Sequence, residues 1–190
     1  MRRALLLLAL AGCGTSAASD QEAPPVTEKT EGAQLIGTRP PEWTATTWFN
    51  APHAPLRLAD LRGKVVLVRW FMSPACPYCS ATAPALVELD ARYRDRGLVV
   101  VGMYHHKGKA PLDVEAVRGY VAHYGFRFPV AVDDGWADLR AWWLTRDRDF
   151  TSASYLVDRE GVIRYVHRGG TYAPGDADFR ALERQIQALL

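Results

Sequence analysis

The sequence has little cysteine, no apolar stretch long enough to cross a membrane, and no excess of charge of one sign. Its 23 Lys and Arg residues nearly balance its 21 Asp and Glu residues, which gives a formal net charge of +2. This balance gives no electrostatic reason to expect nucleic acid as a partner. At 190 residues, 48% of them hydrophobic, the chain is long enough for one packed domain with an N-terminal extension and too short for two typical domains.

The N-terminus has the pattern of an export signal. Two arginines precede an apolar run over residues 4–11, and Cys13 follows closely. The run is far shorter than the roughly 20 residues that a membrane-spanning helix needs. Residues 10–13, Leu-Ala-Gly-Cys, resemble the lipobox of bacterial lipoproteins, in which the signal is removed and the cysteine becomes the lipidated N-terminus. We therefore expect a lipoprotein signal peptide over residues 1–12 and a lipid on Cys13.

Residues 13–41 are expected to carry the lipid and to form a flexible linker. They are rich in Ala, Ser, Thr, Glu, Pro and Gly, with little apolar periodicity. Gly14 rather than Asp follows the lipidated cysteine, which by analogy with lipoprotein sorting in two-membrane bacteria favours the outer membrane. The alternative is ordinary signal cleavage near residues 17–18, with Cys13 discarded. The sequence thus predicts an exported protein, lipid-anchored to a membrane and facing the periplasm.

The order of apolar patterns predicts an α/β fold. Residues 65–71 are a nearly continuous run of β-branched and aromatic residues, typical of a buried strand, and Pro77 suits the first turn of a helix that continues to residue 93. Strand, helix, strand, helix in alternation implies a parallel sheet with right-handed crossovers. The later elements expected are a strand at 98–104, a helix at 113–124, a strand at 128–132, a helix at 136–144, an antiparallel hairpin at 154–158 and 162–167, and a helix at 176–190.

Cys76 and Cys79 can pair only with each other once Cys13 is set aside. A structural disulfide more often joins distant segments, because closing a long loop constrains the unfolded chain more. Cys76 is expected where a buried strand turns into a helix, so the helix dipole and unpaired N–H groups favour its thiolate and make it the nucleophile. Cys79, about one turn later, is placed to attack a mixed disulfide on Cys76 and is the expected resolving thiol.

A Cys-x-x-Cys pair can also be half of a zinc site. A structural zinc site usually needs four Cys or His ligands, and the sequence has no second pair with ligand spacing. We therefore expect a redox centre with no metal and no other cofactor.

The residues around this pair resemble the thioredoxin fold, specifically the exported thioredoxin-like proteins of the TlpA and ResA type, also classed as redoxin or alkyl hydroperoxide reductase/thiol-specific antioxidant domains. The resemblance covers about residues 41–190 and implies a thioredoxin-like domain at 42–190, with a central mixed sheet and helices on both faces. It is carried by Leu61-Arg62-Gly63-Lys64, Cys76-Pro77-Tyr78-Cys79, Pro84, and Tyr155-Leu156-Val157-Asp158 with Gly161.

The resemblance also implies how the site is used. Cys76 is expected to be exposed and Cys79 shielded, while a disulfide-containing protein or small thiol docks across the motif and an upstream thiol donor supplies electrons. The residues expected to contact substrate are Pro77, Tyr78, Ser152 and Ala153.

Three positions depart from the family pattern. Ser152 stands where the family usually has a cis proline facing the cysteines, and because a cis bond before a non-proline residue costs about 2.5 to 4 kcal/mol, we expect trans. Trp70 stands where many thioredoxins have a buried acid that accepts a proton. Ala75 replaces the tryptophan that often precedes the first cysteine.

His105 and His106 follow the second predicted strand. In a parallel sheet the loops at the carboxyl ends of strands share one edge, which is where Cys76 should lie. These histidines are therefore candidate proton-transfer residues, and a solvated loop is the alternative. Trp136, Trp142 and Trp143 are better explained by core packing or a partner-contact patch than by cofactor binding.

The sequence favours a membrane-anchored thiol–disulfide oxidoreductase that reduces protein disulfides. A thiol peroxidase of the peroxiredoxin type is an alternative, because Ser73 precedes Cys76 as in a peroxidatic motif, although Arg69 stands where that motif opens with proline. A copper- or zinc-binding thioredoxin-fold chaperone, with a ligand from His105-His106 beside the two cysteines, is the other alternative.

Overall fold

The computed structural model describes residues 31–145 and 148–190. The signal peptide, Cys13 and most of the expected linker lie outside the described residues. Within them, six strands form one sheet in the order β1-β4-β3-β2-β5-β6. β2, β3 and β4 are parallel, whereas β1, β5 and β6 are antiparallel to their neighbours, which confirms the mixed α/β sheet. The strands are β1 (Thr47–Phe49), β2 (Val65–Phe71), β3 (Leu98–His105), β4 (Val130–Asp133), β5 (Ser154–Val157) and β6 (Ile163–His167).

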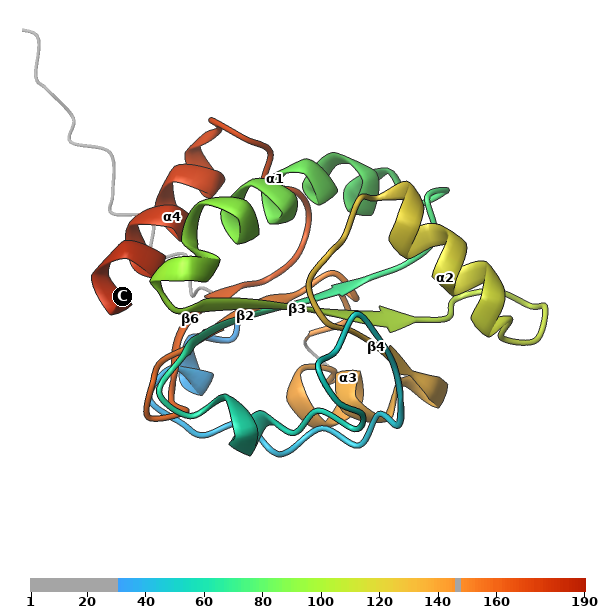
Figure 1. Cartoon of the computed structure of the whole chain (residues 1–190), viewed down its shortest axis with the longest axis horizontal. Helices are drawn as coiled ribbons and strands as arrows, with labels where there is room; N and C mark the ends of the chain where they lie inside the picture. The colour runs from blue at the N-terminus through green and yellow to red at the C-terminus, as the bar shows by residue number, and fades with distance from the viewer. Residues whose placement is uncertain (1–30, 146–147) are drawn as a thin grey trace, which may run out of the picture.

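Helices cover both faces of this sheet, as expected. In Figure 1, α1, α2 and α4 lie on one face, and α3 lies on the other together with the segment that leads into β2. The α-helices are α1 (Pro77–Tyr93), α2 (Val114–His123), α3 (Ala137–Trp142) and α4 (Ala177–Leu189). Short 3-10 helices occupy Ala33–Leu35, Leu58–Leu61, Arg94–Arg96 and Asp134–Trp136.

β2 is the central strand that carries the chain to the cysteine pair. All seven of its residues are buried, since both faces of the strand are covered. Val65, Leu67 and Phe71 pack with α1, α2 and α4 in one core cluster. Val66, Val68 and Trp70 pack in a second cluster on the other face. The alternation places Arg69 on the α1 face, where an apolar residue would be expected.

The observed elements differ from the predicted ones mainly at their ends. The third parallel strand begins at Val130 rather than residue 128, directly after Pro129, which lacks an N–H for the ladder. β3 continues one residue further than expected and includes His105. The hairpin of β5 and β6 lies where the sequence indicated it.

The described chain contacts the domain before residue 42, the expected domain boundary. The N–H of Gly37 donates to the carbonyl of Ile163 at 2.8 Å, and the N–H of Ile163 donates to the carbonyl of Thr38 at 2.9 Å. These two bonds fix the entering chain beside the first residue of β6. None of the helices in residues 31–145 and 148–190 is long and apolar enough to cross a membrane.

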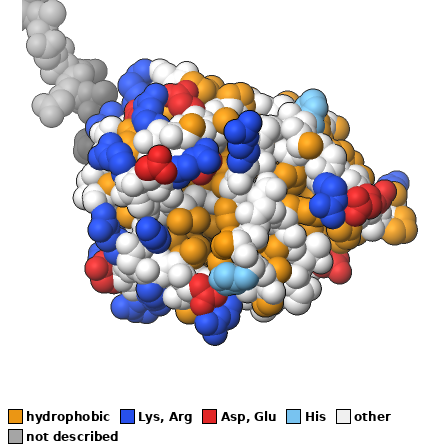
Figure 2. All heavy atoms as spheres, viewed as in Figure 1, with side chains coloured by type: hydrophobic (Ala, Val, Ile, Leu, Met, Phe, Trp, Pro, Cys, Tyr) orange, Lys and Arg blue, Asp and Glu red, His pale blue; other side chains and the backbone are white. Residues whose placement is uncertain are grey.

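The surface in view carries charges of both signs. Figure 2 shows Lys and Arg side chains interspersed with Asp and Glu, and apolar side chains reaching the surface between them. This mixed face agrees with the near balance of charge in the whole sequence.

Candidate redox site

Cys76 lies at the N-terminus of α1, immediately after the loop that follows β2. It is the N-cap residue, and Pro77 takes the first helical position, where a missing N–H is no loss. The Cys76 Sγ accepts the backbone N–H of Cys79 at 3.3 Å. This amide and the helix dipole favour negative charge on the Cys76 sulfur. The strand-to-helix position that the sequence predicted for Cys76 is confirmed.

Cys79 lies directly behind Cys76 and is shielded from solvent. It is 4% exposed, whereas Cys76 is of intermediate exposure. The two Sγ atoms are 2.6 Å apart, and the Cys79 Sγ also accepts the N–H of Met72 at 3.3 Å. Burial, followed by the hydrogen bond to Cys76, raises the pKa of Cys79 to about 12. Cys79 is therefore a protonated thiol at neutral pH.

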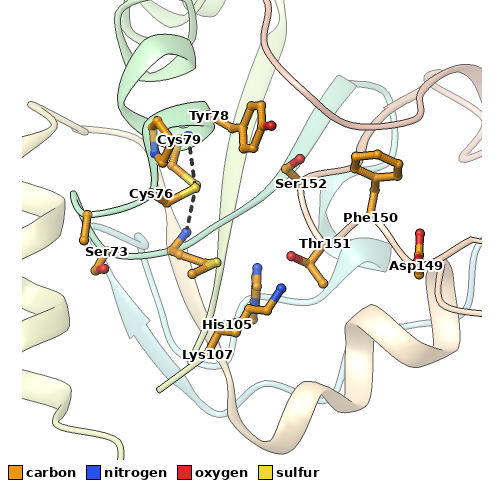
Figure 3. A pocket seen from close by; sticks show the side chains of 13 residues that line it. Ser73, Cys76, Tyr78, Cys79, His105, Lys107, Asp149, Phe150, Thr151 and Ser152 are labelled. Atoms are coloured by element: carbon orange, nitrogen blue, oxygen red, sulfur yellow. Dashed lines mark hydrogen bonds between the residues drawn. The ribbon is translucent and has the colours of Figure 1, made fainter. Parts of the chain in front are cut away.

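A cavity of about 650 Å³ opens over the cysteine pair. Figure 3 shows side chains from three segments pointing toward it: the loop and helix start around the cysteines, the end of β3, and the segment before β5. Its lining residues are Met72, Ser73, Ala75, Cys76, Pro77, Tyr78, Cys79, His105, Lys107, Asp149, Phe150, Thr151 and Ser152.

The cavity brings together six of the eight expected catalytic and substrate-contact residues and leaves out two. Ala153 is fully buried in the core behind the cavity. His106 is held elsewhere: its Nε2 lies 2.7 Å from the carbonyl of Ala110 and its Nδ1 lies 3.3 Å from the Tyr104 hydroxyl. His106 lines a separate small pocket that does not include either cysteine.

The sequence did not predict that the residues before Ser152 line the cavity. Phe150 and Tyr78 are the exposed aromatic residues of the cavity, at 51% and 53%, and they lie on either side of Ser152 in Figure 3. Exposed aromatic side chains beside a reactive thiol are suited to contact a peptide. The available signal was the position of Phe150, two residues before Ser152.

His105 reaches the cavity from the end of β3 and is 1% exposed, so the alternative of a solvated loop is wrong for this residue. Its ring packs edge-on against Trp136 at 5.2 Å between centroids. Burial, helped by the positive charge of Lys107, lowers the pKa of His105 to about 4. The imidazole is therefore neutral at pH 7, and its Nδ1 has no hydrogen-bond partner within the described residues.

Ser152 occupies the position where the family usually has a cis proline. The described residues contain one cis peptide bond, Ala54–Pro55, so the bond before Ser152 is trans as expected. The Ser152 Oγ accepts the N–H of Gly170 at 3.1 Å, and Gly170 has a φ of 79°, which favours glycine. The hydroxyl thus ties the segment before β5 to the loop that follows β6.

Replacing Ser152 by alanine is expected to lower the free energy of unfolding by about 1 kcal/mol, because the half-buried N–H of Gly170 loses its acceptor. Urea unfolding of the reduced protein measures this loss. Thr46→Ala removes an exposed hydroxyl and is the matched control, expected to change stability by less than about 0.5 kcal/mol. Equal stability of the two variants would show that the Ser152 hydroxyl does not hold the loop.

Trp70, at the position of the usual buried acid, faces away from α1. Its indole N–H donates to the Asp133 Oδ2 at 3.2 Å. The same carboxylate accepts the N–H groups of Asp138 and Leu139 at 2.9 and 2.8 Å, so Asp133 caps the start of α3. Burial raises the pKa of Asp133. Asp133 is a buried carboxylate that the sequence did not reveal, but it does not line the cavity.

Two other tryptophans pack in the core. Trp142 and Trp143 are 3% and 0% exposed, in agreement with core packing.

Within residues 31–145 and 148–190 no group of three or more Cys, His, Asp or Glu side chains is arranged to hold a metal ion.

A family model described as redoxin matches residues 19–186. Among curated proteins, the chain is 33% identical over 165 residues to protein DipZ of Mycobacterium tuberculosis, covering 83% of this chain and 22% of DipZ. It is 27% identical over 128 residues to thiol-disulfide oxidoreductase ResA of Bacillus anthracis, covering 67% of this chain and 66% of ResA. The chain thus spans about a fifth of the length of DipZ.

Solved structures show the same fold. A Chlorobium tepidum protein described as a candidate thiol:disulfide interchange protein DsbE has a TM-score of 0.65 and 25% identity, covering 81% of this chain and 96% of its own. A secreted Mycobacterium tuberculosis disulfide oxidoreductase has a TM-score of 0.58 and 24% identity, covering 77% and 96%. The thioredoxin-like fold expected from the sequence is confirmed.

Proposed function

Because the chain belongs to the redoxin family, we propose that it is a thiol–disulfide oxidoreductase in which Cys76 attacks a disulfide and Cys79 resolves the intermediate. The observation that carries this proposal is the arrangement of the two sulfurs. Cys76 lies at the cavity and at the N-terminus of α1, and the buried Cys79 Sγ is 2.6 Å behind it. The Cys76 sulfur is therefore the more accessible of the two to a partner.

The reaction follows from this arrangement. The Cys76 thiolate attacks one sulfur of a client disulfide, forming a mixed disulfide and releasing the other client sulfur as a thiolate. Cys79 then attacks the Cys76 sulfur, an internal disulfide forms, and the client leaves as a dithiol. The cavity wall around Tyr78, Phe150 and Ser152 is the surface against which the client peptide lies during both steps.

We propose that the chain acts as a reductant rather than an oxidant. Strong thiol oxidants stabilise their reduced form, typically through a thiolate of low pKa. Here burial raises the pKa of Cys79, so the reduced form gains no such stabilisation from its second thiol. Dedicated disulfide donors have reduction potentials of about −120 mV. A measured potential close to that value would contradict the proposal that the chain acts as a reductant.

We propose that the protein works outside the cytoplasm, held to a membrane by a lipid on Cys13. The support for the anchor is the short signal-like segment followed by the lipobox-like residues 10–13. The secreted Mycobacterium tuberculosis disulfide oxidoreductase, which shares the fold, agrees with an extracytoplasmic location. Incorporation of labelled fatty acid that is lost in a Cys13→Ser chain is the test of the anchor.

The function is tested by trapping its intermediate. In a Cys79→Ser chain the mixed disulfide on Cys76 cannot be resolved, so it is expected to accumulate as a stable covalent adduct with client proteins. Adducts are detected as reducible bands and identified by mass spectrometry. The Cys76→Ser chain is the matched control and is expected to trap nothing.

The alternative functions predict different outcomes with the reduced wild-type protein. Rapid consumption of peroxide, with sulfenic acid on Cys76 and no client adducts, would indicate a peroxidase instead. Stoichiometric copper(I) uptake abolished by His106→Ala would indicate a metal chaperone, although His106 lies outside the cavity. Neither outcome is expected.

A further inference from the structure

Arg69 is a fully buried cation in the middle of β2. Its Nη1 donates to the Ser154 Oγ at 3.2 Å, and its Nη2 donates to the carbonyl of Gly170 at 2.8 Å and lies 3.5 Å from the Thr82 Oγ1. The guanidinium carbon lies 5.2 Å from the centroid of the Tyr172 ring. All of these partners are neutral. No Asp or Glu in the described part of the chain forms an ion pair with Arg69.

A buried charge without a counter-charge is costly, and arginine cannot escape the cost by losing its proton. The Arg69 Nε is also buried without a partner. An apolar residue would fit the alternation of β2 better, because Leu67 and Phe71 on the same face belong to the core. A negative charge that forms close to Arg69 in one state of the protein would offset this cost.

The two cysteines are close enough to act on Arg69 and become negatively charged during thiol–disulfide exchange. The Cys79 thiol lies against the chain just after β2, where its Sγ accepts the N–H of Met72 at 3.3 Å. On the helix side Arg69 contacts Thr82, which follows Cys79 by three residues and so lies on the same face of α1. The guanidinium thus lies between the strand and the helix that hold Cys79.

We propose that Arg69 is a positioning residue whose buried positive charge stabilises the thiolate that Cys79 forms when it resolves a mixed disulfide. The inference rests on the proposed function. Many thioredoxins have a buried acid near the resolving cysteine, but in this chain Trp70 occupies that position and Asp133 lies on the other face of the sheet. The proposal gives the neighbouring residue, Arg69, an electrostatic role in the same step.

The directions of the pKa shifts of Cys79 and Arg69 agree with the position of Arg69 near Cys79. Burial is the largest influence on Cys79 and raises its pKa, whereas the hydrogen bond from the Met72 N–H and, to a smaller extent, the charge of Arg69 act to lower it. In return, Tyr172, followed by Cys79 and Cys76, favours the charged form of Arg69 against its burial. Cys79 needs this help because its thiol is otherwise held neutral.

The resolving step conserves atoms and charge. Cys79 gives up its thiol proton to bulk solvent, and its sulfur forms a bond to the Cys76 sulfur as the bond between Cys76 and the client sulfur breaks. The client sulfur leaves with the electron pair and takes up a proton. No additional oxidant or reductant is needed, and Arg69 neither gains nor loses a proton.

Other ionisable groups surround this step and must be considered in any pH dependence. They are Cys76 of α1, Tyr124 after α2, His167 of β6, Tyr172 before α4, His105 and Lys107 at the end of β3, and Asp149 before β5. Burial holds His167 and Tyr172 toward their neutral forms, since it lowers the pKa of His167 and raises that of Tyr172. Neither can replace Arg69 as a permanent positive charge.

The test compares Arg69→Met and Arg69→Gln with Arg69→Lys in full-length chains carrying Cys13→Ser. Reduced protein is mixed with an equimolar aromatic disulfide whose thiol product is coloured. The first phase of colour reports attack by Cys76, and the second phase, the release of the second thiol, reports resolution by Cys79. Arg118→Met, which removes an exposed arginine from α2, is the matched control.

The two neutral variants are expected to slow the second phase at neutral pH much more than the first. A rise of one unit in the pKa of Cys79 lowers its thiolate fraction tenfold, and the more basic thiolate recovers about threefold in nucleophilicity, so the net slowing is about threefold per unit. The pH profile of the second phase should move to higher pH, which a merely structural change would not cause. Arg69→Lys should stay close to the wild type, and Arg118→Met should be unchanged.

The pKa of Cys79 is measured separately from the ultraviolet absorbance of its thiolate in Cys76→Ser chains, with and without Arg69→Gln. An unchanged pKa and an unchanged second phase would overturn the proposal. So would a failure of both neutral variants to fold, because the charge would then serve the fold itself. Absence of any second phase in the wild type would instead refute the proposed function, and the pKa comparison would still stand.

Discussion

Replacing Cys76 by serine is expected to reduce disulfide exchange by at least about a thousandfold, to the uncatalysed rate. A serine hydroxyl cannot form the mixed disulfide, and Cys79 cannot take over, since it is 4% exposed and burial raises its pKa to about 12. The measurement is the rate at which reduced protein reduces a protein disulfide under single-turnover conditions, with free thiols labelled after acid quenching.

The Cys79→Ser chain is the comparison that shows whether the loss of exchange activity is specific to Cys76. It keeps Cys76 and the N-terminus of α1, so the first attack is expected to continue while the second step stops. If the Cys76→Ser chain retained exchange activity, Cys79 would have to attack client disulfides itself despite its burial, and the assignment of the two roles would be wrong.

The protein is expected to lose stability in mild acid because His105 is buried in its neutral form. The folded pKa is about 4, below the ordinary value of 6.5, so the unfolded chain binds the proton more tightly. Stability is therefore lost as the pH falls from about 6.5 towards about 4, and between pH 7 and about pH 4.5 the contribution of this one group is about 2 kcal/mol.

A His105→Gln chain should show this loss to a smaller extent. Urea unfolding at the two pH values measures it, and the wild type is expected to lose about 2 kcal/mol more than the variant. His123→Gln, at an exposed position of α2, is the matched control and should behave as the wild type. His167 and Asp158, whose lowered pKa values act in the same direction, are present in all three chains and cancel in the comparison. Parallel losses in wild type and His105→Gln would show that His105 is not the group responsible.

The parts of the fold that the sequence predicted are those in which local pattern and final environment agree. β2 is apolar throughout because both of its faces are covered, and the start of α1 combines a cap position with Pro77. The cysteine pair could be placed because it lies at the junction of these two elements. His105 was assigned to the correct edge of the sheet, but its burial depends on Trp136, which is distant in sequence.

The parts that could not be predicted depend on long-range contacts. Asp133 of β4 meets Trp70 of β2 across the one strand between them, β3, and Phe150 reaches the cavity only because the segment before β5 lies opposite α1. Arg69 within an apolar strand was a visible exception to the pattern. Its neutral partners come from β5, α1 and the loop after β6, which no local pattern joins.

The pairing of Gly37 and Thr38 with Ile163 sets the end of the sheet at which the described chain joins the domain. Ile163 pairs with Val157, and Val157 pairs with Val66 near the start of β2, whereas the cysteines follow the other end of that strand. The described chain therefore enters the domain at the end of the sheet remote from the cavity. With the lipid proposed on Cys13, the tether would therefore join the domain at the end of the sheet opposite the reactive sulfur, and it would leave the face that carries the cavity free for a client.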